Sequence, residues 1–81
     1  MTPLNDQIID ILRRAKGPLT FREIQEQCTI WESPKRQPTH AELSPILLGL
    51  ARKAIVKSRR MTDGQGFPVV KFELTPKHRA M

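Results

Sequence analysis

A change of hydrophobic period constrains the fold of this chain more than any other feature of its sequence. Residues 43–54 repeat leucines at the three- and four-residue spacing of a helix, whereas residues 55–60 alternate as a strand does. The two patterns meet with no residue between them. A helix must therefore run almost directly into a strand, which leaves room for only a tight turn.

A β-hairpin is predicted to follow this helix. The strand at 55–60 is rich in β-branched and basic residues, and Asp63 and Gly64 suit a tight turn after it. Residues 68–74 alternate again and form the second strand. One face of that strand would carry Val70, Phe72 and Leu74, and the other Val69, Lys71 and Glu73.

Two further helices are predicted ahead of this unit. The first covers residues 2–17, where apolar residues recur at helical spacing, Thr2 can cap the start and a Gly-Pro pair ends the helix. The second covers residues 19–28. There Thr20 and Glu23 have the spacing of a capping box, in which each side chain bonds the backbone of the other residue.

The connection at residues 29–38 has two prolines and mixed polarity, which predicts a loop. Trp31 is expected to fold back onto the core, although an exposed Trp31 would instead indicate a contact surface. The third helix has two candidate starts. Thr39 and Glu42 can form a second capping box, whereas Ser44 could cap a shorter helix that begins at the next proline. Either start turns Leu47, Leu50 and Ala54 toward the core.

Size and charge narrow the choice of function. A chain of 81 residues holds one domain, predicted at 1–76, followed by a basic, disordered tail at 77–81. Residues 1–34 carry four basic and five acidic side chains, whereas residues 35–81 carry ten basic and three acidic ones, a net charge of +7. This asymmetry favours a polyanionic partner, usually nucleic acid and sometimes a membrane surface. The same charges would also suit a solvated strand face.

Several function classes are disfavoured by what the sequence lacks. Cys28 is the only cysteine, so it can form neither an internal disulfide nor a cysteine-based zinc site, and we expect it in the core. His40 and His78 have no carboxylate partner at a catalytic spacing, and no phosphate-binding glycine loop occurs. Neither a signal-like start nor an apolar run of about 20 residues is found. We therefore expect a cytoplasmic protein that is not an enzyme and uses no cofactor or metal.

The order of three helices and a hairpin resembles the winged helix-turn-helix domain of bacterial regulators such as the MarR group. The residues that carry the resemblance are Ser44, Leu47, Leu50, Ala54, Ile55 and Val56. It implies an α+β fold with a two-stranded wing, and a small transcriptional regulator of a bacterium or bacteriophage. It also implies binding of double-stranded DNA, with the third helix in the major groove. This chain departs from the pattern because Ala54 replaces a glycine and residues 29–38 replace a tight turn.

Candidate DNA contacts lie before the third helix, on it and on the wing. They are Lys35 and Arg36, then Thr39, His40, Ser44 and Arg52, then Lys57, Arg59, Arg60, Gln65 and Lys71. Only Arg52 on the helix has the paired donors that read base edges well. The set therefore suits contacts with phosphates more than sequence readout.

The outer side of the third helix is unexpectedly apolar, since it consists of Ala41, Pro45 and Leu48 before Arg52 is reached. An exposed apolar patch of this kind also suits a protein contact. The alternative function is therefore a protein-interaction adaptor that uses this face. A homodimer or a second protein is the further candidate partner.

Overall fold

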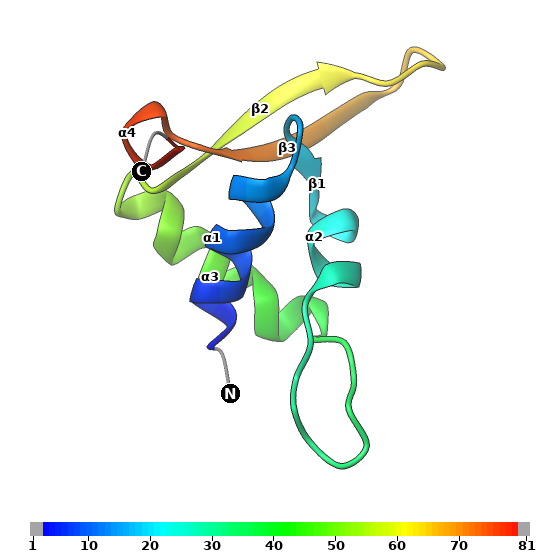
Figure 1. The fold of residues 1–81 in the computed structure, drawn as a ribbon. Coiled ribbons are helices and arrows are strands. Elements are labelled where there is room, and N and C mark those ends of the chain that lie inside the picture. The colour runs from blue at the N-terminus through cyan, green and yellow to red at the C-terminus, as the bar shows by residue number, and fades with distance from the viewer. Residues whose placement is uncertain (1–2, 80–81) are drawn as a thin grey trace.

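The computed structural model describes residues 3–79 and forms a sheet with helices packed beneath it (Figure 1). The helices are α1 (Leu4–Arg14), α2 (Phe21–Gln27), α3 (His40–Arg52) and a short α4 (Pro76–Arg79). The strands are β1 (Leu19–Thr20), β2 (Val56–Thr62) and β3 (Pro68–Leu74), in the antiparallel order β1-β3-β2. The β2–β3 hairpin, called the wing below, extends beyond the helices.

The predicted α+β fold of three helices followed by a hairpin is confirmed, with two additions. Strand β1 was not predicted; Leu19 pairs with Phe72 and Thr20 with Lys71, which fastens the start of α2 to the sheet. Helix α4 takes up the first part of the tail expected at 77–81, and residues 80–81 lie outside the described residues.

Local capping decides where α2 and α3 begin. The Thr20 hydroxyl accepts a bond from the Glu23 backbone N–H, and the Glu23 carboxylate accepts one from the Thr20 N–H, so the predicted capping box is confirmed. Thr39 and Glu42 form the same box at α3. The longer of the two predicted starts is therefore correct, and Pro45 lies inside the helix.

Helix α1 begins at Leu4, with Pro3 at the cap position and no side-chain capping bond. The cap predicted at Thr2 lies outside the described residues. Pro3 thus precedes the first helical residue.

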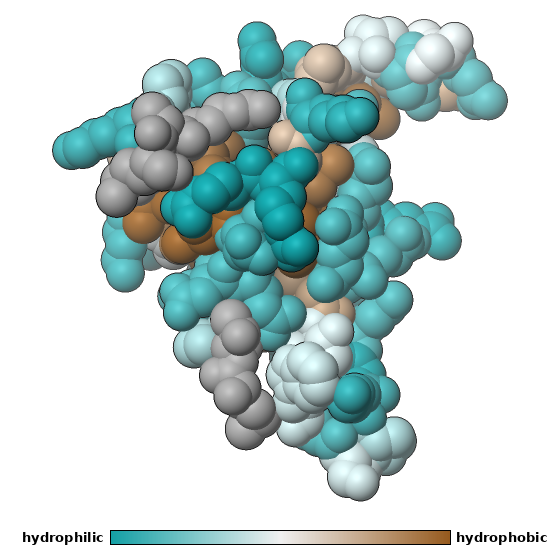
Figure 2. Space-filling model, viewed as in Figure 1, coloured by the Kyte–Doolittle hydropathy of each residue, from teal (hydrophilic) through white to brown (hydrophobic). Residues whose placement is uncertain are grey.

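The core lies between the three long helices and the sheet. Its buried members are Ile8, Ile11, Leu12, Ile24, Cys28, Leu43, Leu47, Leu50, Val56 and Leu74. Cys28 is 2% exposed, as predicted, and burial raises the pKa of its thiol to about 11, so that the thiol is protonated at neutral pH. Figure 2 shows apolar residues between α1 and the sheet, surrounded by a largely hydrophilic surface.

The expectation that Trp31 folds onto the core is wrong, because its side chain is 48% exposed. The backbones of Ile30 and Arg36 exchange two hydrogen bonds, of 2.8 and 3.2 Å. These bonds close the loop on itself, below the helices in Figure 1. Trp31 instead contacts Lys35, whose Nζ lies 4.2 Å from the centre of the indole ring, a cation–π arrangement.

Ala54 was also expected to face the core, but it is exposed and forms the turn between α3 and β2. Its φ of +58° lies in the left-handed region. The Ile55 N–H donates to the Leu50 carbonyl and the Ala54 N–H to the Ala51 carbonyl, both at 3.0 Å. This is a Schellman motif, whose left-handed position normally carries glycine because a Cβ is strained there.

We predict that Ala54→Gly raises the free energy of unfolding by roughly 0.5–1 kcal/mol, because it removes the Cβ strain of the left-handed conformation. Ala51→Gly is the matched control, since it puts the same residue within α3 and should lower stability by roughly 0.5–1 kcal/mol. Urea denaturation of the three proteins measures both effects. A loss of stability in both variants would contradict the strain at Ala54.

Candidate nucleic-acid interface

The register of the wing divides its basic residues between two faces. Residues directly opposite one another in an antiparallel pair point to the same side of the sheet. Val56 lies opposite Leu74 and both are buried, so they mark the inner face, which is directed toward the helices. The inner face continues with Ser58, Arg60, Val70 and Phe72, and the opposite, outer face carries Lys57, Arg59, Lys71 and Glu73.

The outer face carries three cations and one carboxylate that offsets them in part. The Glu73 Oε1 atom lies 3.4 Å from the Lys57 Nζ and 3.6 Å from an Arg59 nitrogen. The Glu73 side chain is only 11% exposed, whereas those of Lys57 and Arg59 are about half exposed. Lys71 is partly buried beside Thr20 of β1. This face is therefore less positive than its basic residues alone imply.

The inner face of the wing presents one cation, Arg60, opposite Val70. Arg60 is exposed and forms no ion pair with any carboxylate of the described residues. Val70 is on the face predicted for it but is 48% exposed, because this part of the hairpin lies past the end of the core. Arg60 is thus available to a ligand that approaches from the side of α3.

The tip of the wing is a compact turn built on Asp63. One Asp63 carboxylate oxygen accepts the backbone N–H groups of Gln65 and Phe67, each at 2.9 Å. Gly66 has φ +87°, which a residue with a Cβ would adopt only at a cost. Gln65, a predicted contact, is exposed at this tip, and so is Phe67, which sequence reasoning overlooked and which is 63% exposed.

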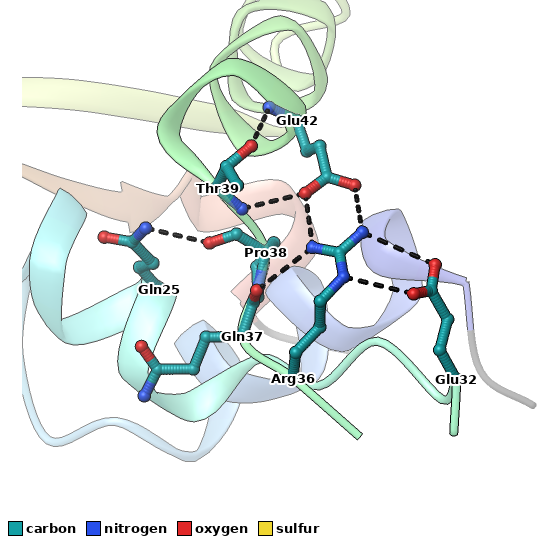
Figure 3. A network of polar contacts seen from close by, with 7 residues as sticks. All are labelled: Gln25, Glu32, Arg36, Gln37, Pro38, Thr39 and Glu42. Carbon is teal, nitrogen blue, oxygen red and sulfur yellow. Dashed lines mark hydrogen bonds and ion pairs between the residues drawn. The ribbon is translucent and has the colours of Figure 1, made fainter. Parts of the chain in front are cut away.

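Arg36 holds the loop at 29–38 against the start of α3 (Figure 3). Its guanidinium pairs with both oxygens of Glu42, at 2.6 and 2.8 Å, and with Glu32 at 3.2 Å. The Gln25 amide adds a bond of 2.8 Å to the Pro38 carbonyl, which anchors the same end of the loop, just before α3, to α2. A contact between Arg36 and a phosphate, as predicted from the sequence, would require these ion pairs to break.

The predicted contacts on α3 do not form one cluster. Thr39 is engaged in the capping box, and the ring of His40 lies 4.5 Å from that of Phe21 on α2. Arg52 is at the opposite end of the helix, about 18 Å from His40 at the usual helical rise. Arg52 is exposed and pairs with no carboxylate among residues 3–79. Ser44 lies between these ends and is partly buried.

Ser44 belongs to a groove between α3 and the inner face of the wing, which has a volume of about 220 Å³. The groove is lined by Phe21, Ser44, Leu47, Leu48, Ala51, Ser58 and Phe72. Leu48, on its edge, is 54% exposed. The sequence singled out Leu48 and Ser44 as candidate contact residues. It could not predict that Ser58 and Phe72 form the opposite wall of the groove, because that depends on how the hairpin lies over α3.

Neither a metal site nor a membrane-spanning helix is found in the described part of the chain. Among residues 3–79, no three His, Cys, Asp or Glu side chains gather in a way that could hold a metal ion. None of the described helices is both long and apolar enough to cross a membrane.

We predict that Glu42 makes the protein sensitive to acid. The hydrogen bonds from Arg36, and next that from the Thr39 backbone, lower the pKa of Glu42 from 4.5 to about 2. The pKa of Glu42 is thus lower in the folded than in the unfolded protein. The ionised carboxylate therefore stabilises the fold fully above about pH 4.5, and this contribution is lost as the pH falls toward 2. The urea midpoint should therefore fall more steeply with pH in the wild type than in Glu42→Gln.

Glu26→Gln controls for the change in net charge, because Glu26 pairs with Arg22 on the exposed side of α2 and with no other cation of the described residues. Parallel pH profiles for the wild type and Glu42→Gln would show that the ion pair with Arg36 adds nothing to stability.

Comparison with known proteins identifies the fold. The sequence matches no family model and no curated protein. The structure, however, is similar to that of a PadR-like transcription factor from Bacteroides fragilis, with a TM-score of 0.69. The likeness covers 95% of this chain and 70% of the other, at 22% sequence identity. It favours no particular group of regulators, so the resemblance to the MarR group stays a prediction, but the chain has the winged helix-turn-helix fold.

Proposed function

We propose that this protein is a small transcriptional regulator of a bacterium or bacteriophage that binds double-stranded DNA with α3 and the wing. The observation that carries the proposal is a winged-helix hairpin with basic side chains on both faces, projecting past the core. Arginine and lysine in such a position suit phosphate oxygens, which receive most protein–DNA hydrogen bonds. The similar PadR-like protein is itself a transcription factor, which supports the same class of function.

In this proposal, the basic residues that have no carboxylate partner make the strongest contacts with DNA phosphates. Arg52 and Arg60 are exposed without a carboxylate partner in the described part of the chain, so they are the principal phosphate contacts. Lys57, Arg59 and Lys71 contribute from the outer face, where Glu73 reduces their net charge.

The remaining proposed contacts are at the two ends of the interface. Gln65 reaches DNA from the wing tip, whereas Thr39, His40 and Ser44 make at most single hydrogen bonds near the start of α3. Lys35, which lies over Trp31, contributes from the loop that precedes α3. Arg36 has a mainly structural role, because its guanidinium already forms ion pairs with Glu32 and Glu42.

A single winged helix covers only a short site. Useful sequence specificity therefore requires a homodimer or a second DNA-binding protein.

We predict that the double variant Arg59→Ala and Arg60→Ala weakens binding to all duplex sequences by a similar factor. Each phosphate contact that is lost should also reduce the log–log salt slope by about 0.9. Fluorescence anisotropy with a labelled random-sequence duplex, between about 50 and 200 mM salt, measures both quantities. The charge-matched control is Arg13→Ala with Arg14→Ala, which removes two exposed arginines from α1.

If both double variants bind equally well, the wing is not the phosphate-binding element. If the wild type fails to bind any duplex at low salt, the DNA-binding proposal itself is wrong.

The second candidate function is a protein-interaction adaptor, which the exposure of Leu48 beside an apolar groove favours. Here Leu48→Asp should abolish capture of the partner from nuclease-treated host lysate. Its thermal unfolding should match the wild type, because Leu48 is more than half exposed. Capture that survives this substitution would count against the adaptor.

A further inference from the structure

We infer that the outer side of α3 recognises the C5-methyl groups of thymine in the major groove. This inference rests on the proposed function, which puts α3 against duplex DNA, and it adds the chemical group that the helix reads there. The preferred targets are then duplexes with thymines at the contacted positions.

The first observation is the absence of base-reading side chains along most of α3. Recognition of base edges by hydrogen bonds uses Arg, Lys, Asn or Gln, which pair two donors or acceptors with one base. The exposed positions before the last turn of α3 are instead occupied by His40, Ala41, Pro45 and Leu48. His40 is packed against Phe21. Hydrogen bonding therefore cannot be the main way in which this helix distinguishes sequences.

The second observation is that α3 offers an open apolar surface beside these positions, on its flank toward the wing, with Leu48 at the boundary. Leu48 is 54% exposed and borders the groove of about 220 Å³. Leu47 and Phe72 supply apolar walls, and Ser44 and Ser58 are its hydroxyl-bearing members. Such a surface suits small apolar groups that project from a polar ligand. In unmodified DNA, the thymine methyl is the apolar group that base edges display in the major groove.

The third observation is the charge around this surface, which selects the class of ligand. Arg52 lies at the end of α3 and Arg60 on the inner face of the wing. The ligand must therefore carry negative charge at its borders and apolar groups between them. A DNA major groove has this arrangement, because phosphates line both of its edges.

An acidic amphipathic helix has a similar arrangement of charge and apolar groups. Bound in the groove, however, it would not reach Lys57 and Arg59 on the outer face of the wing, whose two charges Glu73 offsets only in part. The phosphate backbones of a duplex extend past both faces, so DNA accounts for more of the basic residues.

The experiment compares duplexes that differ only in the methyl group at C5. An A·T-rich duplex is titrated beside the same duplex with uracil in place of thymine. A G·C duplex is titrated beside its 5-methylcytosine form. We expect loss of the methyl to weaken binding about fourfold per contacted group, from the usual value for burying one such group. Added methyl groups should strengthen binding, and neither change should alter the salt slope, because the phosphates are the same.

Two variants assign the effect to α3. Leu48→Ala should bring the thymine and uracil duplexes to nearly equal affinity, with the salt slope of the wild type. Val70→Ala removes a comparably exposed apolar side chain from the wing and should keep the difference between the two duplexes.

Salt-sensitive binding with equal affinity for thymine and uracil duplexes would overturn the inference while leaving the proposed function intact. A Leu48→Ala variant that weakens both duplexes by the same factor would overturn it as well. Failure to bind any of the four duplexes at low salt would overturn both proposals and leave the groove as a protein-binding surface.

Discussion

The left-handed turn at Ala54 is the constraint on which the rest of this structure depends. It ends α3 and starts β2 within a few residues, so it sets the angle between the helix and the wing. The Thr75 hydroxyl and N–H donate to the carbonyls of Ala54 and Ile55, which ties the end of β3 to the same turn. Because both ends of the wing meet here, the groove, the position of Arg60 and the exposure of Leu48 follow from this geometry.

Carboxylates decide how much of the positive charge is available to a partner. The second half of the chain has a net charge of +7, but Glu73 offsets part of the outer face of the wing, and Glu42 with Glu32 occupies Arg36. Arg36 stabilises the long loop that this chain has in place of a tight turn, and so positions the start of α3. A count of basic residues therefore overstates the charge of the interface and does not locate it.

Features that depend on neighbouring residues could be predicted from the sequence, and those that depend on distant residues could not. Both capping boxes involve residues three apart, and the leucine stripe of α3 follows from helical periodicity alone. Strand β1 escaped prediction because its two residues form a strand only through pairing with β3, about 50 positions later in the chain. Trp31 was misplaced because two backbone bonds, and not hydrophobicity, direct its loop outward.

The sequence by itself determined the order of the three long helices and the hairpin, the apolar side of α3 and the concentration of positive charge in the second half. These properties follow from periodicity, capping and composition, which are local or additive. Only the tertiary structure decided that Arg60 and Val70 share the inner face of the wing, that Glu73 lies between Lys57 and Arg59, and that Phe72 meets Leu48 across a groove. Each of these depends on strand register and on the turn at Ala54, which bring together residues that are distant in the chain.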